Sequence, residues 1–341
     1  MTSASRHVPD DGDGLPLWQV AEARGRVAGV VRPVVVDLIE DFSRAPRTDR
    51  GLDLPAGTRV WAALEFRQHT GSFKARGAWN FLAAHRESAP LPAAGIAIAS
   101  GGNAGLACAW AASRAGVPAT VYLPTTAPAV KLARLRALGA TIVQRGVTYA
   151  DASAACSEEA PSRGALLSHA YDDLLVAAGA GTLVEEIRAT VESVSDIVVA
   201  VGGGGLFSGV AVAGQAHGIR THAVEPRDCR ALHAALDAGR PVPVECHSVA
   251  ADALGSTRAS AMAVATAAST DARSLLVSEA AVTRMRHWLW ESRRLVVEHA
   301  AAVALAGVEQ LEPAGRDVVV VLCGANTDPA DLAGAPAEER A

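Results

Sequence analysis

Short strand-like runs alternate with longer helical patterns along most of the chain, and this alternation constrains the fold more than any other feature. The runs are rich in Val, Ile and Ala, and the stretches between them carry helix stop signals such as a terminal glycine. Strands and helices that alternate in this way predict an α/β fold with parallel sheets. We expect strands at residues 95–100, 118–124, 140–146, 196–201, 220–225 and 316–324, and an amphipathic helix at residues 300–311.

These units fall into two groups along the sequence. Residues 71–165 follow a strand–helix–strand–helix–strand order, which predicts a small domain inserted in the sequence. Residues 15–70 and 166–341 are expected to form a larger domain, since a chain of this length corresponds to about two domains. Residues 1–14 are polar and rich in Asp, Gly and Pro, so we expect a disordered extension there. Two adjoining sheets predict a ligand-binding cleft between them.

Composition and charge narrow the kind of partner and the compartment. A net charge of −5 and a pI near 6.1 give no basic surface for nucleic acid or an anionic membrane, so we expect a small-molecule partner. No signal-like start and no long uncharged apolar run is present, which predicts a cytoplasmic protein that does not enter the membrane. The five cysteines form no CxxC pair, which fits a reducing compartment; they are Cys108, Cys156, Cys229, Cys246 and Cys323.

The string VGGGGLFSG is the strongest local signal in the sequence. Four consecutive glycines, Gly202, Gly203, Gly204 and Gly205, leave a predicted buried strand and enter a predicted helix. Glycine removes every Cβ where a backbone must approach a ligand, and the first N–H groups of a helix attract an anion. A flexible turn is the other interpretation, but an ordinary strand-to-helix turn does not need four glycines. We therefore predict a phosphate-binding loop.

A dinucleotide site is the alternative for this loop, because Glu225 follows at about the distance of the acidic residue that binds a ribose. The spacing of the glycines excludes it. A GxGxxG motif that starts at Gly202 needs a glycine where Phe207 stands, and one that starts at Gly203 needs a glycine at Ser208. A single phosphate therefore fits this loop better than a dinucleotide.

A second loop of similar design occurs in the string ASGGNAGLA. Ser100, Gly101, Gly102 and Asn103 offer a hydroxyl, backbone N–H groups and an amide at the start of a predicted helix. Such groups suit a carboxylate. Taken alone, the string is equally compatible with a helix cap provided by Asn103.

Lys74 lies in the string HTGSFKARGA, between Phe73 and a second cation. Burial or a neighbouring positive charge lowers the pKa of an amine and makes it a nucleophile. The alternative is a helix start capped by Thr70 or Ser72, with Lys74 and Arg76 in solvent. The decapeptide alone does not decide between the two.

The strings TGSFKARGA, SGGNAGLA, VGGGGLFSG and VLCGAN, in this order, resemble the serine/threonine dehydratase branch of the fold-type II pyridoxal phosphate enzymes. The resemblance extends from about residue 60 to residue 328. It implies two parallel-sheet α/β domains, related to the tryptophan synthase β subunit, with the cofactor in the cleft between them. It also implies that Lys74 forms the Schiff base with pyridoxal 5'-phosphate and later acts as the base at the substrate Cα.

The resemblance implies further contacts residue by residue. The cofactor is expected to contact Phe73, Lys74, Asn103, Gly202, Gly203, Gly204, Gly205, Leu206 and Cys323, with the thiol facing the pyridine nitrogen. A weakly polar thiol beside the pyridine nitrogen would moderate the electron withdrawal by the cofactor ring, which suits β-elimination. The substrate is expected to contact Ser100, Gly101, Gly102, Asn103 and Ala104.

Some positions depart from the family pattern. Racemases carry a second serine where this chain has Gly101, and β-replacement or threonine synthases carry aspartate where it has Ala75. Ala253 replaces a glycine and is expected to crowd the cofactor face. A monovalent or divalent cation could bind to Glu225, but Ala231 stands where an acidic partner is usual. The sequence therefore does not decide whether the protein binds a metal ion.

The function expected from this resemblance is a pyridoxal phosphate-dependent dehydratase, or ammonia-lyase. It would eliminate water from L-serine, L-threonine or a related β-hydroxy amino acid and give a 2-oxo acid and ammonia. The alternatives are a β-replacement synthase or an amino-acid racemase of the same fold, and a phosphate-ligand binding protein without chemistry. The family likeness also suggests a homodimer.

Overall fold

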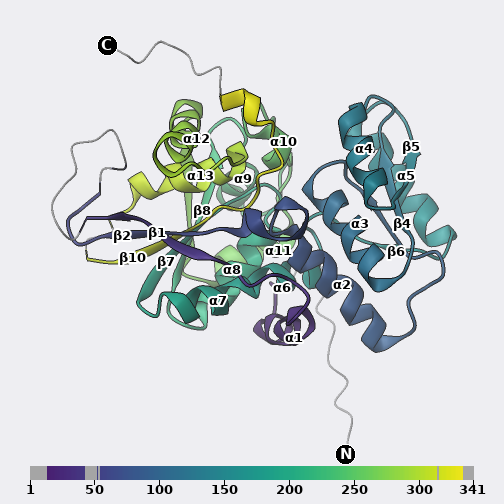
Figure 1. The fold of residues 1–341 in the computed structure, drawn as a ribbon, viewed down its shortest axis with the longest axis horizontal. Coiled ribbons are helices and arrows are strands. Elements are labelled where there is room, and N and C mark those ends of the chain that lie inside the picture. Colours follow the sequence, from purple (N-terminus) through teal and green to yellow (C-terminus); the bar gives the residue numbers. More distant parts are fainter. Residues whose placement is uncertain (1–13, 43–51, 53, 313–314, 333–341) are drawn as a thin grey trace, which may run out of the picture.

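The computed structural model describes residues 14–42, 52, 54–312 and 315–332. Within these residues the strands form two sheets, one of six strands and one of four, on two sides of the molecule (Figure 1). The α/β fold with parallel sheets is confirmed. The predicted disordered extension lies outside the described residues, apart from residue 14.

The six-stranded sheet has a core of parallel, valine-rich strands. Every neighbouring pair is parallel except for the edge strand β1, which pairs antiparallel with β2. The central strand β10 has the sequence DVVVV and is buried at all five positions, as expected for a strand covered on both faces. In spatial order the strands are β1 (Val36–Asp41), β2 (Arg59–Ala63), β10 (Asp317–Val321), β7 (Val194–Ala200), β8 (Arg220–Pro226) and β9 (Arg273–Val277).

Helices cover both faces of this sheet (Figure 1). The helix α13 (His299–Gly307) packs on β7, β8, β9 and β10 and is itself covered by α12 (Glu279–Arg293). The other face is covered by α8 (Gly205–Gln215), beside α6 (Leu174–Gly181) and α7 (Leu183–Thr190). The prediction of an amphipathic helix at residues 300–311 was wrong, because α13 is buried on every side between the sheet and α12.

The four-stranded sheet is parallel throughout. Its strands lie in the order β5 (Thr141–Gln144), β4 (Ala119–Leu123), β3 (Ile96–Ala99) and β6 (Leu166–Leu167). Its covering helices are α3 (Asn103–Ala115), α4 (Ala129–Ala137) and α5 (Tyr149–Ser162), and α2 (Lys74–Ser88) packs between α3 and α6. The division into two domains at residues 70 and 165 stays a prediction, although β6 shows that this sheet continues beyond residue 165.

The remaining elements connect these layers. They are α1 (Leu17–Val27), α9 (Ala231–Asp237), α10 (Ala251–Leu254), α11 (Ala261–Ser269) and the 3₁₀ helices η1 (Glu65–Arg67), η2 (His69–Gly71), η3 (Val308–Gln310) and η4 (Pro329–Leu332).

The topology of the large sheet marks where a ligand belongs. From β7 the chain proceeds to β8 on one side, whereas β10 lies against β7 on the other side. Such a reversal opens a crevice at the carboxyl ends of the two central strands. The four glycines follow the end of β7, and Cys323 follows the end of β10. The fold therefore brings two of the sequence motifs to one place.

A buried ion cluster fixes α2 against the large sheet's helices. The Arg76 side chain is fully buried and donates to both carboxylate oxygens of Glu65, at 2.7 and 2.9 Å. It also donates to both carboxylate oxygens of Glu186, at 2.7 and 2.8 Å. Because Lys74 lies two residues earlier, this cluster also fixes the position of the lysine.

We expect Arg76→Met to lower the free energy of unfolding by about 3–5 kcal/mol, since it leaves the buried Glu65 carboxylate without a cation. Urea unfolding followed by circular dichroism measures the loss. The matched control is Arg145→Met, which breaks a solvent-exposed pair with Glu159 and should cost far less stability, because water screens such pairs. Equal losses in the two variants would contradict this assignment.

Candidate active site

The Lys74 amine lies in the interior, at the first residue of α2. Its Nζ donates a hydrogen bond to the carbonyl oxygen of Ala170 at 2.6 Å. No carboxylate of the described residues forms an ion pair with it. Burial therefore lowers the pKa of Lys74 to about 8, and the nearby Cys323 opposes this only in part. An amine with this pKa can lose its proton and act as a nucleophile near neutral pH.

The alternative helix-cap interpretation of this segment does not match the structure. The N-cap residue of α2 is Phe73, and it makes no side-chain cap. The hydroxyls of Thr70 and Ser72 are buried and make no hydrogen bond with a described residue. Thr70 also has a positive φ of 63°, a conformation that non-glycine residues rarely adopt. Helix capping therefore does not explain the conformation of this segment.

The four glycines form a cradle between β7 and the first turn of α8. A Cβ on Gly203 would lie 2.1 Å from the ring of Tyr171, and one on Gly204 would lie 2.3 Å from Ala263. Gly204 also has a φ of +103°. The N–H groups of the first turn of α8, which begins at Gly205, have no acceptor within the helix. The loop therefore fits an anion such as a phosphate, as the sequence predicts.

The second predicted loop joins β3 to α3. Ser100 Oγ accepts from the backbone N–H of Gly102 at 3.4 Å, and Asn103 is the first residue of α3. Gly101, Gly102 and Asn103 line a small cavity of about 30 Å³. The methyl group of Ala104 is buried in the neighbouring core, so this residue can offer a ligand only its backbone.

A buried carboxylate that the sequence analysis missed joins this loop to the rest of the site. Both carboxylate oxygens of Glu298 accept from Asn103 Nδ2, at 3.0 and 2.9 Å, and one accepts from the backbone of Asn326 at 2.7 Å. Asn326 Nδ2 donates to Asn103 Oδ1 and to the carbonyl of Thr70, each at 2.7 Å. The loops that contain Thr70, Asn103 and Asn326 therefore form one hydrogen-bonded unit.

Burial raises the pKa of Glu298, while the hydrogen bonds from Asn103 and Asn326 lower it. The only sequence signal for Glu298 was one acidic residue before an alanine-rich helix, which is too common to single out.

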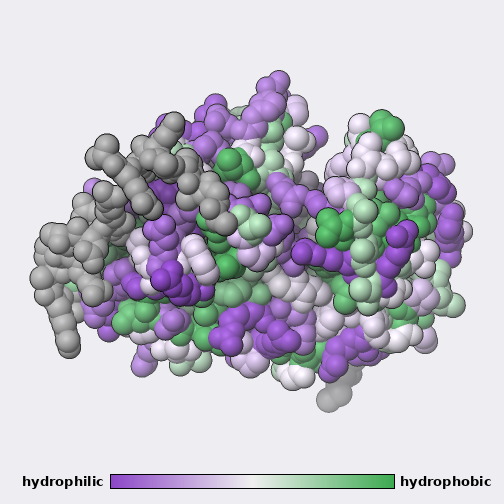
Figure 2. Space-filling model, turned by 45° about the horizontal axis from the view of Figure 1, so that its top comes forward, coloured by the Kyte–Doolittle hydropathy of each residue, from purple (hydrophilic) through white to green (hydrophobic). Residues whose placement is uncertain are grey.

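The small cavity lies where the two sheets face each other, and Figure 2 shows a notch between the two lobes of the molecule. Lys131 on α4 and Asp252 on α10 form an ion pair of 2.5 Å across this region. Ala253 also lines the cavity, and its place against the cofactor stays a prediction. The walls further include Leu106, Arg134, Glu298 and Asn326.

Cys323 lies between the lysine and the carboxylate network. Its carbonyl accepts from the backbone N–H of Phe73 at 3.0 Å, and its side chain is buried. Burial, with a smaller contribution from Glu298, raises the pKa of the thiol to about 12. The thiol is therefore neutral at physiological pH.

Glu225, the residue predicted for a cation, has another role in the structure. Its carboxylate is fully buried and accepts from the backbone N–H groups of Leu232 and His233, each at 2.8 Å. Burial raises its pKa to about 7. The described residues contain no group of three or more His, Cys, Asp or Glu side chains that could hold a metal ion.

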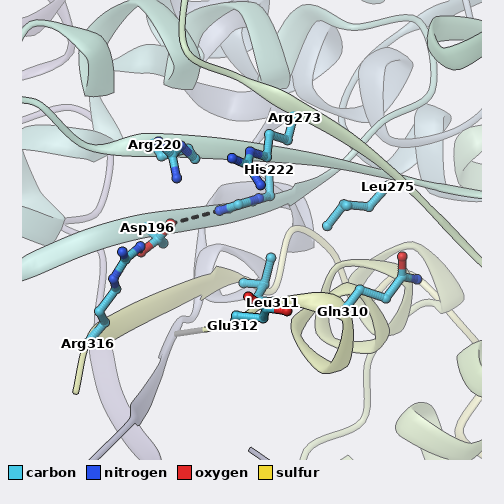
Figure 3. Close-up of a pocket in the computed structure, with 9 residues that line it drawn as sticks. All are labelled: Asp196, Arg220, His222, Arg273, Leu275, Gln310, Leu311, Glu312 and Arg316. Carbon is cyan, nitrogen blue, oxygen red and sulfur yellow. Dashed lines mark hydrogen bonds and ion pairs between the residues drawn. The ribbon is translucent and has the colours of Figure 1, made fainter. Parts of the chain in front are cut away.

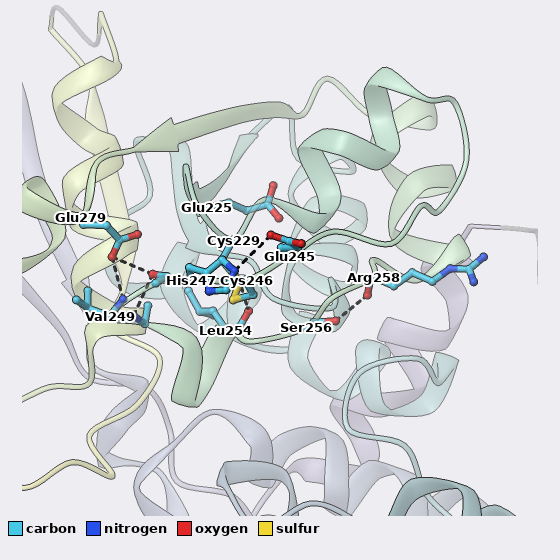
Figure 4. Close-up of a disulfide and its surroundings, with 12 residues drawn as sticks. Glu225, Cys229, Glu245, Cys246, His247, Val249, Leu254, Ser256, Arg258 and Glu279 are labelled. Carbon is cyan, nitrogen blue, oxygen red and sulfur yellow. Dashed lines mark hydrogen bonds and ion pairs between the residues drawn. A yellow bond between two sulfur atoms is a disulfide. The ribbon is translucent and has the colours of Figure 1, made fainter. Parts of the chain in front are cut away.

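The structure corrects the expectation for the cysteines. Cys229 and Cys246 form a disulfide, with their Cα atoms 4.3 Å apart (Figure 4). Cys108, Cys156 and Cys323 are free and buried. The pair is separated by 17 positions in the sequence, and no spacing motif signals it, so only the fold brings it together. Cys229 Sγ also lies 3.4 Å from the carbonyl of Leu254, at the end of α10.

Comparison with known proteins decides the family. The pattern of the family described as "Pyridoxal-phosphate dependent enzyme" matches residues 45–324. The chain belongs to this family. The resemblance to its serine/threonine dehydratase branch is confirmed by relatives such as an L-threonine ammonia-lyase of Geobacter sulfurreducens, which is 33% identical over 92% of this chain and 76% of the relative. A phenylserine dehydratase of Ralstonia pickettii is 31% identical over 95% of this chain and 97% of the relative.

Solved structures agree with this placement. The threonine deaminase isoform 2 of Solanum lycopersicum superposes with a TM-score of 0.83 at 26% identity, and the match covers 94% of this chain and 88% of the other. A pyridoxal 5'-phosphate-dependent aspartate racemase superposes with a TM-score of 0.82, also at 26% identity, over 95% and 99% of the two chains. The fold-type II architecture is therefore confirmed.

None of the helices in the described ranges combines the length and the apolar character that crossing a membrane requires.

We expect Lys74→Met to stabilise the cofactor-free protein by about 2 kcal/mol at pH 7. The amine has a pKa of about 8 in the folded protein and 10.5 as an ordinary lysine, so folding disfavours its charged form. The charged amine therefore destabilises the folded wild-type protein fully below pH 8, and this destabilisation disappears as the pH rises to 10.5. Urea unfolding of the variant and the wild type between pH 7 and pH 10 measures the difference.

Lys131→Met is the matched control, because Lys131 is the only other lysine in the sequence and has a carboxylate partner. It should not stabilise the protein. A Lys74→Met variant less stable than the wild type at pH 7 would show that the amine is not buried as described.

Reduction of the Cys229–Cys246 disulfide should lower the stability by about 3 kcal/mol, because it releases a loop closed over 17 residues. Thermal unfolding with and without a phosphine reductant measures the change. Cys246→Ser should unfold at one temperature whether or not the reductant is present. If thiol titration of the non-reduced protein found all five cysteines free, the pairing would be wrong.

Proposed function

We propose that this protein removes water from a small β-hydroxy α-amino acid, with L-serine and L-threonine as the first candidates, and releases a 2-oxo acid and ammonia. The observation that carries the proposal is the buried amine of Lys74, which has a lowered pKa and donates to the carbonyl of Ala170, the neighbour of the Tyr171 that packs on the glycine loop. The names of the relatives support it, since they include threonine ammonia-lyases and a serine dehydratase/threonine deaminase.

The residues present fit pyridoxal phosphate. The glycine cradle and the first turn of α8 suit its phosphate, and Cys323 offers a neutral thiol at the end of β10. When bound, this cofactor supplies the electron sink that makes the substrate Cα acidic. Phe73, Leu206 and Asn103 are further contacts proposed for it.

The chain's own residues would then position the substrate and move a proton. The backbone N–H groups and hydroxyl of residues 100–102 would bind the substrate carboxylate at the start of α3, with Ala104 contributing only its backbone. Glu298 would hold Asn103 in place through its two hydrogen bonds. Because the Lys74 pKa is about 8, its amine can take the Cα proton near neutral pH.

Racemisation is less well supported, although one structural neighbour is an aspartate racemase. A racemase needs a second acid on the opposite face of the substrate, and Gly101 has no side chain to supply it. A Cβ at this position would lie 2.8 Å from Leu123 Cδ2, so even a serine there would require Leu123 to move.

The assembly, compartment and cation are further parts of the proposal. The family likeness favours a homodimer, and the absence of a CxxC pair, together with three free buried cysteines, favours a reducing compartment such as the cytoplasm. In a reducing cytoplasm, the Cys229–Cys246 pair would be held as two thiols. A cation near Glu225 would share the carboxylate oxygens with two backbone N–H groups and would need further ligands.

Lys74→Ala should lower the rate of 2-oxo acid release by about 10²–10⁴-fold, the usual contribution of a positioned base. It should also remove the visible absorption band of the cofactor. The assay measures 2-oxo acid and ammonia from serine, threonine, phenylserine and 3-hydroxyaspartate, with Arg145→Met as the control that keeps full activity. A wild-type protein that binds the cofactor but releases no ammonia from any of the four would refute the dehydratase assignment.

A further inference from the structure

The Cys229–Cys246 disulfide lies at the same edge of the large sheet as the glycine loop. Gly202 comes two residues after the end of β7, and Cys229 comes three residues after the end of β8. Because β7 and β8 are neighbouring parallel strands, both segments leave the sheet at its carboxyl edge. The disulfide and the loop that we propose for the cofactor phosphate are therefore at one end of the sheet.

The opposite edge of the sheet holds a different feature. A cavity of about 350 Å³ lies at the amino ends of β7, β8 and β9, where the Asp196 carboxylate hydrogen-bonds to His222 Nε2 at 2.8 Å (Figure 3). The length of the strands separates this pair from the disulfide. The pair is therefore an internal reference for changes that are confined to the carboxyl edge.

One residue connects the disulfide to the glycine loop. The Sγ atom of Cys229 is buried and lies 3.4 Å from the carbonyl oxygen of Leu254, the last residue of α10. The same residue also packs against the loop, since a Cβ on Gly202 would lie 3.2 Å from the Cα of Leu254. The sulfur and the loop therefore have the backbone of Leu254 as a common neighbour.

Cys246 belongs to a segment without helix or strand that leads into α10. We call this segment, residues 241–250, the strap. After Cys246 the strap is held by Glu279 of α12, whose carboxylate accepts from the backbone N–H of Val249 at 2.9 Å (Figure 4). The disulfide is the covalent tie between the strap and the segment that follows β8.

Solvent reaches the disulfide through Cys246. Cys229 is 1% exposed, whereas Cys246 is half-buried. Its neighbours Glu245 and His247 have side chains that are 92% and 78% exposed. A thiolate from solution can therefore attack the sulfur of Cys246 and release Cys229 as the leaving thiolate.

We propose that this cysteine pair is a redox switch on the retention of the cofactor. In the disulfide form, the strap and α10 hold the glycine loop in the shape that accepts the phosphate. In the dithiol form the two sulfur atoms are no longer bonded and must separate, and Leu254 moves because it lies against the Cys229 sulfur. The dithiol form therefore holds the phosphate less tightly. The switch rests on the proposed place of the phosphate at the glycine loop.

The oxidant that closes the switch is a low-molecular-weight disulfide. The Cys246 thiolate attacks it, forms a mixed disulfide and releases one small thiolate. The Cys229 thiol then loses its proton to solvent and attacks the sulfur of Cys246, which releases the second small thiolate. Two protein thiols are oxidised to one disulfide, and the small disulfide is reduced to two thiols. Because a reducing compartment keeps the pair as thiols, the switch responds to a loss of reducing power.

The rate at which the full-length protein releases pyridoxal 5'-phosphate tests the switch. The visible band of the cofactor is followed while a phosphatase destroys the free cofactor, with and without prior reduction of the protein by a phosphine. We expect release at least about fivefold faster from the reduced protein, the low end of the usual coupling between two sites. Pyridoxal, which lacks the phosphate, should leave both forms at the same rate.

The same measurement separates this proposal from the proposed function. A protein that never develops the visible band would refute the cofactor site itself. A band that is lost at one rate from both forms would overturn the switch and leave the cofactor site intact.

Two variants and a second readout place the effect. Cys246→Ser should release the cofactor as fast as the reduced wild type, whether or not the reductant is present. Cys156→Ser is the matched control, because Cys156 is a free, buried cysteine on α5, and it should respond to the reductant as the wild type does. Amide hydrogen exchange should become faster in the strap and the glycine loop after reduction, and stay unchanged in the peptide that contains His222. A strap that exchanges equally in both forms would contradict the proposal.

Thermodynamic linkage gives an independent measurement. If the disulfide tightens cofactor binding by some factor, bound cofactor must favour the disulfide over the dithiol by the same factor. The protein is equilibrated with mixtures of reduced and oxidised dithiothreitol, with and without saturating pyridoxal 5'-phosphate, and its alkylated thiols are counted by mass spectrometry. The ratio of disulfide to dithiol should rise at least about fivefold with the cofactor. A ratio that the cofactor leaves unchanged would overturn the proposal.

Discussion

The buried amine of Lys74, which donates to a carbonyl and has no carboxylate partner among the described residues, is the constraint on which the rest of the structure depends. A lysine that merely stabilised the fold would be exposed or paired with an anion, as Lys131 is with Asp252. Burial of a cation without a counter-ion costs stability, and the buried ion cluster around Arg76 holds the start of α2, which carries the lysine, in place. The lysine is held where it can react rather than where it is most stable.

The site around this amine is assembled from loops that lie far apart in the sequence. The order of the strands brings the glycine loop after β7 and the Cys323 segment after β10 to the same end of the large sheet. Glu298 then joins Asn103 on the small sheet's side to Asn326 on the other side. These hydrogen bonds therefore tie the loop of the small sheet to the large sheet's side of the site.

The sequence predicted those parts of the fold and site that depend on local patterns. The strand at residues 196–201 and the glycines after it are a local signal, and the structure confirms the strand and places the glycines at the end of β7. Glu298 and the Cys229–Cys246 disulfide were not predictable, because each depends on contacts between distant segments. The buried character of α13 was missed for the same reason: its neighbours on both sides, not its own periodicity, bury it.

Borohydride reduction of the cofactor-loaded protein, followed by proteolysis and mass spectrometry, tests the central claim most directly. The sequence contains only two lysines, Lys74 and Lys131, so the outcome is unambiguous. The account predicts that the reduced cofactor is found on the peptide that contains Lys74, and that Lys74→Ala abolishes the label. A label on Lys131 or on the amino terminus instead, or no label on a protein incubated with excess pyridoxal phosphate, would contradict it.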